Sequence, residues 1–195
     1  MSDFEAIASV SRTLRALLEG HITNDPSFPI AAVPIELRSP KELRQDSVDL
    51  CVSVWLYRVN RNPDLANEPP RPGASTVDRY PIPLDLHFLI TPIADDPESD
   101  QKLLGRLVQV MHDHARIRGP ALQGSLRGGS DELRVTLELL SLEDLSRVWS
   151  ALDEPYELSV PYLVQLIKID SAHDPVQREP VLSRTARYTQ ILEAR

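Results

Sequence analysis

Cysteine and glycine are both scarce in this chain of 195 residues, which holds one cysteine and 7 glycines. Because a disulfide needs two thiols and a cysteine-rich zinc site needs more, Cys51 can form neither within the chain. A chain so poor in glycine is not expected to carry a glycine-rich loop that cradles phosphate groups. Cys51 lies among apolar neighbours, where a thiol behaves as a small hydrophobic group and its pKa rises. We therefore expect no nucleophilic cysteine and a reducing compartment.

Long apolar runs and an excess of positive charge are also missing. No stretch approaches the ~18 to 20 apolar residues of a membrane-spanning helix, so membrane insertion is not predicted. The segment Met1 to Glu5 lacks the features of a secretory signal, so we expect the protein to stay in the cytoplasm. Its 21 basic and 29 acidic residues give a formal net charge of −8 without a basic run. This balance argues against a nucleic-acid partner.

The chain does have apolar residues and prolines in number. Hydrophobic residues make up 42% and charged residues 26% of the chain, as in an ordinary globular protein, so a core can be buried. Six of the 17 prolines lie between Arg58 and Pro83, in a stretch without apolar periodicity. Such a composition cannot bury enough surface to order itself, so we predict a long mobile hairpin loop there.

Local patterns predict three helices and five strands. Each helix is indicated by capping residues followed by an apolar stripe: from the Ser2–Glu5 capping box to Gly20, after Asp96 and Pro97, and from Ser141 through Trp149. Strands are indicated by alternation: a short edge strand within 30–37, then 50–57, 84–91, 133–139 and 158–166. Pro161 suggests that the last of these strands lies at an edge or contains a bulge.

These elements predict the fold class. Strand 50–57 is apolar on both faces, which indicates a place inside a sheet that is covered on both sides. We therefore expect an α/β (α+β) domain over residues 1–170, with a single mixed, largely antiparallel sheet of about four to five strands flanked by helices. The apolar period weakens after Ser171, and Pro175 and Pro180 interrupt it, so residues 171–195 are predicted to form a C-terminal arm.

The one pair of residues with catalytic potential is Asp85 and His87. Two residues apart on a strand, they share a face, as an acid/base pair or two metal ligands would need. A third ligand or a nucleophile would have to come from elsewhere, and no matching motif is present. We favour a structural role under the helix layer, and we predict no catalytic residue, no metal and no cofactor. A small metal-dependent or hydrolytic enzyme that uses Asp85 and His87 remains an alternative.

Other titratable residues have simpler explanations. His112 and His114 lie about 200° apart on one helix, so they cannot chelate one ion. The acidic run 95–100 lacks the glycine and the terminal glutamate of a calcium loop, and helix capping explains it.

Several segments, in this order and spacing, carry a resemblance to a known family. They are Tyr80-Pro-Ile-Pro-Leu-Asp-Leu-His-Phe-Leu-Ile-Thr-Pro92, Asp100-Gln-Lys-Leu-Leu-Gly-Arg106, Met111-His-Asp113, Glu132-Leu-Arg-Val-Thr-Leu137, Leu142-Glu-Asp-Leu-Ser-Arg-Val-Trp-Ser-Ala-Leu152 and Pro155-Tyr-Glu-Leu-Ser-Val-Pro-Tyr162. Together they resemble the tail-terminator (cap) proteins of phage-tail-like contractile injection systems of the antifeeding-prophage or virulence-cassette type. Pro161 stands where a small residue is expected.

The resemblance implies a structural protein without catalysis. It implies a homohexameric ring on the distal end of the inner tube and contractile sheath, which ends polymerisation and stabilises the particle. The partners implied are further copies of the chain and the sheath and inner-tube proteins. The subunit would assemble in the cytoplasm and could leave the cell with the particle. A monomeric adaptor domain is a further alternative.

Two groups of residues are assigned to the subunit or sheath interface. The first lies in the proline-rich loop and consists of Arg79 and Tyr80. The second lies in the modestly basic arm, where arginine can meet carboxylates on an otherwise acidic protein, and consists of Arg178, Arg184, Arg187, Tyr188 and Ile191.

Overall fold

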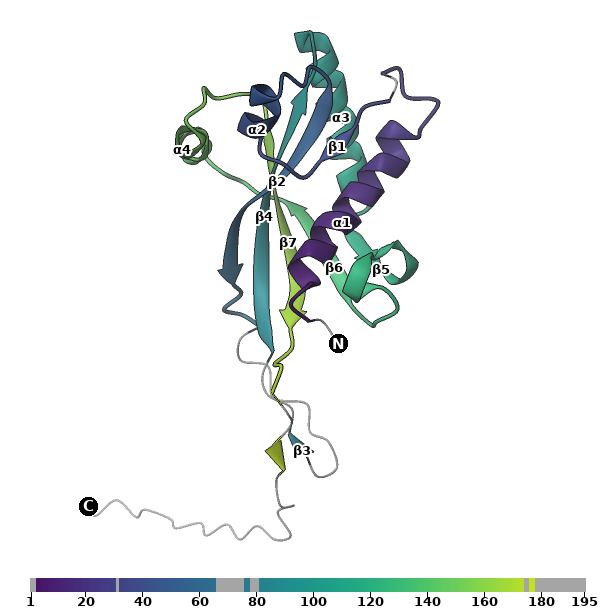
Figure 1. The fold of residues 1–195 in the computed structure, drawn as a ribbon, viewed down its shortest axis with the longest axis vertical. Helices are drawn as coiled ribbons and strands as arrows, with labels where there is room; N and C mark the ends of the chain where they lie inside the picture. The colour runs from purple at the N-terminus through teal and green to yellow at the C-terminus, as the bar shows by residue number, and fades with distance from the viewer. Residues whose placement is uncertain (1–2, 31, 66–75, 78–80, 174–175, 178–195) are drawn as a thin grey trace, which may run out of the picture.

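The computed structural model describes residues 3–30, 32–65, 76–77, 81–173 and 176–177. Its centre is one six-stranded sheet with the order β1-β2-β4-β7-β6-β5 (Figure 1). The strands are β1 (Ile35–Glu36), β2 (Cys51–Arg61), β4 (Ile82–Ile93), β5 (Arg116–Arg118), β6 (Glu132–Leu137) and β7 (Val160–Ile169). Only β1 and β2 pair in parallel. The predicted fold class is confirmed. The sheet has six strands where four to five were expected, and the strand that the sequence analysis missed is β5.

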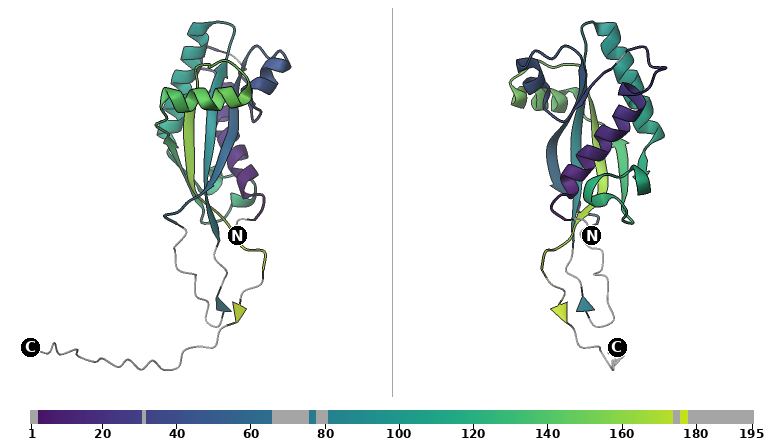
Figure 2. Two further views of the ribbon diagram at one scale, coloured as in Figure 1. Left: turned by 90° about the vertical axis from the view of Figure 1, so that its left-hand side faces the viewer. Right: turned by 45° about the vertical axis from the view of Figure 1, so that its right-hand side comes forward.

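Helices cover both faces of this sheet (Figure 2). α1 (Ala6–Leu18) and α3 (Pro97–Asp113) pack on one face, and α2 (Pro40–Gln45) and α4 (Leu142–Leu152) lie on the other. Alternation along β4 explains the division, since Leu86, Phe88 and Ile90 join the α1–α3 core while Leu89 packs with α4. None of the helices in the described ranges is long and apolar enough to cross a membrane.

β2 and β4 form a longer hairpin than the sequence predicted. Their antiparallel pairing runs from Cys51 opposite Ile93 to Arg61 opposite Leu84, with one bulge after Leu56. The strand thus continues four residues into the segment that was predicted as loop. The rest of that loop falls largely on residues 66–75 and 78–80, which lie outside the described residues.

The predicted helix starts are correct for two helices and wrong for α1. Asp96 accepts hydrogen bonds from the backbone of the first turn of α3, and the hydroxyl of Ser141 accepts one at the start of α4. α1 instead begins at Ala6, with Glu5 at its N-cap position and no side-chain cap. The carboxylate of Asp3 accepts from the backbone N–H of Glu5 at 2.9 Å, so the chain turns there before the helix begins. The predicted cap residue, Ser2, lies outside the described residues.

β7 lies in the middle of the sheet, which corrects the prediction of an edge for the strand with Pro161. β4 pairs with one side of β7 and β6 with the other. Pro161 is tolerated because it is the second residue of the strand, and its carbonyl still accepts from the backbone of Glu138 at 2.9 Å. A bulge does occur further on, where Leu166 adopts a φ of 70°. The apolar alternation therefore shifts by one residue, and Ile167 is buried in the core instead of Leu166.

A second, two-stranded sheet lies beyond the start of β4 and the end of β7 (Figure 1). It pairs β3 (Thr76–Val77) with β8 (Val176–Gln177) in antiparallel orientation. The segment predicted as a loop and the beginning of the predicted arm are therefore partners, which the sequence did not indicate.

Candidate functional site

Asp85 and His87 lie on β4 and point to the face that α2 and α4 partly cover, as the spacing predicted. His87 is 5% exposed, and its Nδ1 lies 2.9 Å from Oε2 of Glu138 at the end of β6. When Nδ1 donates to this carboxylate, Nε2 is left to accept from Nδ2 of Asn60 on β2, at 3.3 Å. His87 therefore links three strands across the sheet.

The carboxylate of Glu138 is the centre of this network. Besides His87 it accepts from the hydroxyl of Tyr57 at 3.4 Å and from Nη2 of Arg58 at 3.4 Å. Burial and the nearby Glu138 raise the pKa of Tyr57 to about 12, so its hydroxyl stays protonated and remains a donor. The carboxylate is thus held by three side-chain donors.

Asp85 belongs to a different set of contacts. Its Oδ1 accepts from Nδ2 of Asn62 at 2.8 Å and from Nε2 of Gln165 at 3.3 Å. Neither amide can serve as a catalytic nucleophile or a proton shuttle. Although Asp85 and His87 share a face, each is hydrogen-bonded to other partners. In the part of the chain that the structure describes, no group of three or more His, Cys, Asp or Glu side chains could hold a metal ion.

The remaining titratable candidates are engaged in local contacts. Cys51 is fully buried, and burial raises the pKa of its thiol to about 11, which disfavours the nucleophilic thiolate. His114 contacts the carbonyl of Val110 through Nδ1 at 2.9 Å, and its ring lies 4.7 Å from that of His21. The sequence did not predict this contact between α3 and the segment after α1.

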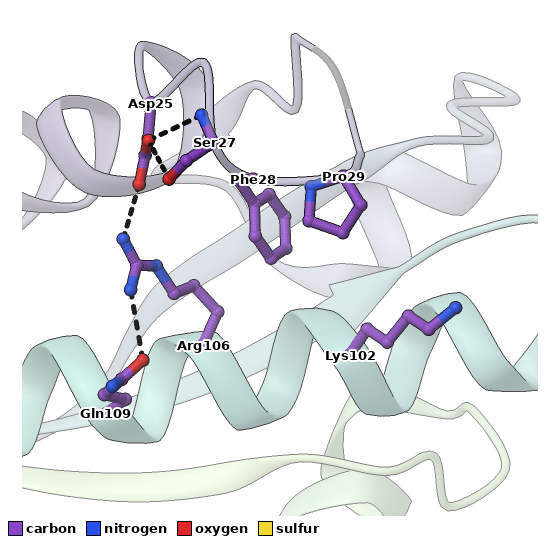
Figure 3. Close-up of a pocket in the computed structure, with 7 residues that line it drawn as sticks. All are labelled: Asp25, Ser27, Phe28, Pro29, Lys102, Arg106 and Gln109. Atoms are coloured by element: carbon purple, nitrogen blue, oxygen red, sulfur yellow. Dashed lines mark hydrogen bonds and ion pairs between the residues drawn. The ribbon is translucent and has the colours of Figure 1, made fainter.

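An open groove of about 360 Å³ lies between α3 and the segment that follows α1 (Figure 3). It is lined by Asp25, Ser27, Phe28, Pro29, Lys102, Arg106 and Gln109. Arg106 crosses the groove and forms an ion pair with Asp25 at 2.6 Å. Hydrogen bonds from Ser27 hold the pKa of Asp25 below its usual value, so the pair stays charged on both sides. Lys102 pairs with Glu98 at 2.7 Å, so neither cation of the groove is without a counter-charge.

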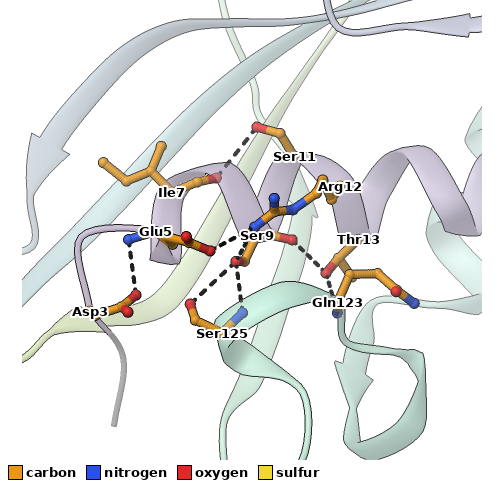
Figure 4. Close-up of polar contacts among 9 residues, drawn as sticks. All are labelled: Asp3, Glu5, Ile7, Ser9, Ser11, Arg12, Thr13, Gln123 and Ser125. Carbon is orange, nitrogen blue, oxygen red and sulfur yellow. Dashed lines mark hydrogen bonds and ion pairs between the residues drawn. The ribbon is translucent and has the colours of Figure 1, made fainter.

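α1 is fastened to the turn before β6 by polar contacts (Figure 4). The hydroxyl of Ser9 accepts from the backbone N–H of Ser125 at 3.1 Å, and that of Thr13 accepts from the backbone N–H of Gln123 at 3.0 Å. Gly124, between these two donors, has a φ of 60°. A side chain at this position would overlap the hydroxyl of Ser9, so glycine is needed for the close approach.

The predicted interface residues Arg79, Tyr80, Arg178, Arg184, Arg187, Tyr188 and Ile191 all lie outside the described residues. The pairing of β3 with β8 nevertheless bears on them. Thr76 is opposite Gln177, and Val77 is opposite Val176. The loop group therefore follows β3, and the arm group follows β8, so both leave the same small sheet.

The family model of the Pvc16 N-terminal domain matches residues 9–183, which is most of the chain. The chain belongs to this family. Its fold is similar to that of a sheath/tube terminator from an extracellular contractile injection system, PVC, with a TM-score of 0.63 and 19% identity over 96% of this chain. It is also similar to the tube terminating cap of the anti-feeding prophage, with a TM-score of 0.62 and 16% identity over 92% of this chain. A comparison with curated proteins finds no match.

As a member of the Pvc16 N-terminal domain family, the chain has the fold that the sequence resemblance implied. It spans 65% of the terminator chain and 60% of the cap chain, so both of these proteins have further residues that this chain does not match. The fold match extends over the α1–α3 face and the central sheet alike. What the sequence missed in this region is the network around Glu138, since Glu138 is far from His87 along the chain and no motif joins them.

Proposed function

We propose that this chain is a structural subunit of a contractile injection system, where it ends the inner tube and sheath at their distal end. The observation that carries the proposal is the fold match over 96% of the chain to a sheath/tube terminator, together with membership of the Pvc16 N-terminal domain family. In this proposal six copies close head to tail into a ring. The ring covers the surface to which the next tube or sheath subunit would add, so polymerisation stops.

The proposed partners are further copies of the chain and the sheath and inner-tube proteins of the same particle. The interface includes Arg79 and Tyr80 and the arm residues Arg178, Arg184, Arg187, Tyr188 and Ile191. Support for this assignment comes from β3 and β8, which bring the beginnings of both segments to one place outside the main sheet. Assembly takes place in the cytoplasm, and the subunit leaves the cell as part of the particle.

The alternative of an enzyme that uses Asp85 and His87 has less support. A general acid/base pair needs its two groups within reach of each other or of one substrate atom. Here Asp85 is held by Asn62 and Gln165, and His87 by Glu138. The groove of Figure 3 lies elsewhere, between α3 and the segment that follows α1, and neither Asp85 nor His87 lines it.

The length of the particles tests the proposal. We expect deletion of the gene to give particles of uncontrolled length or without a distal cap, while the baseplate and tube proteins are still made. Electron micrographs of particles from the deletion strain, the parent and a strain that carries the restored gene would measure the length distribution. An unchanged distribution and an unchanged yield of particles would contradict a role in termination. Native mass spectrometry of the purified protein tests the ring, for which a species of six subunits is expected.

A further inference from the structure

Among the described residues, one edge of β2 has no partner strand over most of its length. β4 pairs with β2 from Cys51 to Arg61. On the opposite edge, β1 pairs only with Val52 and Ser53. Within the described ranges, no strand pairs with this edge from Val54 to Arg61. β2 is therefore an interior strand at its beginning and an edge strand for the rest of its length (Figure 1).

Some backbone N–H groups of this edge point away from β4, to the side where the described part of the chain offers no partner strand. The N–H of Asn62 donates to the carbonyl of Pro83 at 3.0 Å, so it points toward β4. Backbone N–H groups point to alternate sides along a strand of an antiparallel pair, so those of Val59 and Arg61 point away from β4. Residues 58–61 are exposed, and the apolar Val59 among them has 43% of its surface accessible. An exposed row of this kind is a template to which another extended segment can add.

We propose that this edge, Val54–Arg61, binds the C-terminal segment 178–195 of a second copy of the chain as an added strand. The inference rests on the proposed function, because it names the contact that links neighbouring subunits of the ring. The inference also goes beyond the proposed function, because it names β2 as the strand of the neighbouring subunit that accepts the segment.

The composition of the segment fits this role. After Pro180 it contains neither proline nor glycine, so each of its residues can take part in a hydrogen-bonded ladder. Tyr188, Thr189 and Ile191 are residue types that favour strands. The segment therefore combines an uninterrupted backbone with β-favouring side chains.

The place where the segment begins favours a neighbour over its own β2, and its length allows it to reach one. Residues 178–195 number 195 − 177 = 18, which span roughly 60 Å when extended. β7 and β8 carry the chain beyond the end of the main sheet, to the side where β2 also ends (Figure 1). A segment that continues from Gln177 must reverse to reach β2 of the same chain. It can reach a neighbouring copy without reversing.

Cross-linking between two variants of the chain, each with one added cysteine, tests whether the contact forms between different chains. One variant carries Val59→Cys, the other carries Ile191→Cys with a small affinity tag, and a short bis-maleimide is added to the mixture. We expect a cross-linked pair of tagged and untagged chains, which a contact within one chain cannot produce. Cys51 gives little background because it is buried with a pKa near 11. The matched control replaces Val59→Cys by Leu139→Cys, because Leu139 is 94% exposed but follows β6, which β4 and β7 separate from the edge strand β2.

A backbone substitution gives an independent readout. Val59→Pro removes an N–H that points away from β4, whereas Val59→Thr keeps it. We expect Val59→Pro to weaken self-association about tenfold, as the loss of one to two intermolecular hydrogen bonds would. Val59→Thr should associate as the parent does. Circular dichroism and the thermal midpoint of both variants show whether the fold is retained.

The outcomes separate this inference from the proposed function. The Val59–Ile191 cross-link and its Leu139 control are both measured on the purified protein and on the protein assembled with sheath and tube proteins. If six-subunit rings form and set particle length, yet the Val59–Ile191 yield equals that of the Leu139 control, the strand contact is wrong and the terminator role stands. If the protein stays monomeric and particle length does not depend on it, the proposed function fails. A strong cross-link in a double variant of one chain, with none between chains, would place the segment on its own β2.

Discussion

Nδ1 of His87 on β4 lies 2.9 Å from Oε2 of Glu138, at the end of β6, although β7 separates the two strands. The bond passes over β7 on the face that α4 shares. Because both side chains are largely buried, with exposed fractions of 6% and 16%, the contact is shielded from water. It ties the β6 side of the sheet to the β2–β4 hairpin.

We expect His87→Ala to lower the free energy of unfolding by about 1 to 3 kcal/mol, because Glu138 would lose a donor while it remains largely buried. Asp85→Ala should cost about 0.5 to 1.5 kcal/mol, since the amides of Asn62 and Gln165 can turn to water. Urea denaturation would measure both values. Assembly should survive in both variants. Loss of assembly without a change in thermal midpoint would reveal a direct role for this face.

The turn that contacts α1 provides a pair of matched glycine substitutions. Gly124 and Gly119 have nearly the same φ, 60° and 61°, but only Gly124 has neighbours where a Cβ would be. Gly119→Ala should therefore cost only the backbone strain, about 1 to 2 kcal/mol. Gly124→Ala should cost about 1 to 3 kcal/mol more, because its Cβ would overlap Ser9 and lie 2.6 Å from Nη2 of Arg12. Equal destabilisation of the two variants in thermal melts would show that the contact with α1 is not close.

Asp96 makes stability depend on pH through the start of α3. Hydrogen bonds from the backbone and side chain of Ser99 hold the pKa of Asp96 below its ordinary value. With the folded-state pKa lowered, its carboxylate stabilises the fold fully above the unfolded pKa of about 3.9, and this contribution is lost as the pH falls through the folded-state pKa. Asp96→Ala should therefore lower the thermal midpoint at pH 7, and the difference from the parent should vanish in acid. Asp95→Ala, the exposed neighbour without a capping role, is the control. A difference that persists unchanged in acid would mean that Asp96 acts through packing.

Two truncations separate the arm from the small sheet. Ending the chain after Gln177 removes the proposed interface residues of the arm and leaves β8 in place. Ending it after Asp170 also removes β8, the partner of β3. Both should retain the circular dichroism of the six-stranded sheet, because its last strand ends at Ile169. Both should lower the occupancy of caps in particle images. Equal occupancy in the truncated and full-length proteins would show that the arm is dispensable.

The local sequence determined most of the secondary structure and the fold class. The alternation within 84–91 indicated the strand β4, whose residues Leu86, Phe88 and Ile90 all join one core, because the period of a strand is set by its own backbone. Asp96 and Ser141 identified helix starts, because a cap acts on the backbone of the next turn. These signals come from residues within a few positions of each other.

Only the tertiary structure decided which elements became neighbours. A proline suggested that β7 lies at an edge, yet pairing with β4 and β6 placed it at the centre of the sheet. There Pro161 removes only one backbone donor, close to the start of the strand. Glu138 became the partner of His87 through strand order, and β3 became the partner of β8 across a long separation in the chain. Such contacts depend on the register of whole strands and on the burial of whole faces. No short motif encodes them, so the candidate site could be placed on its strand from the sequence but its partners could not be named.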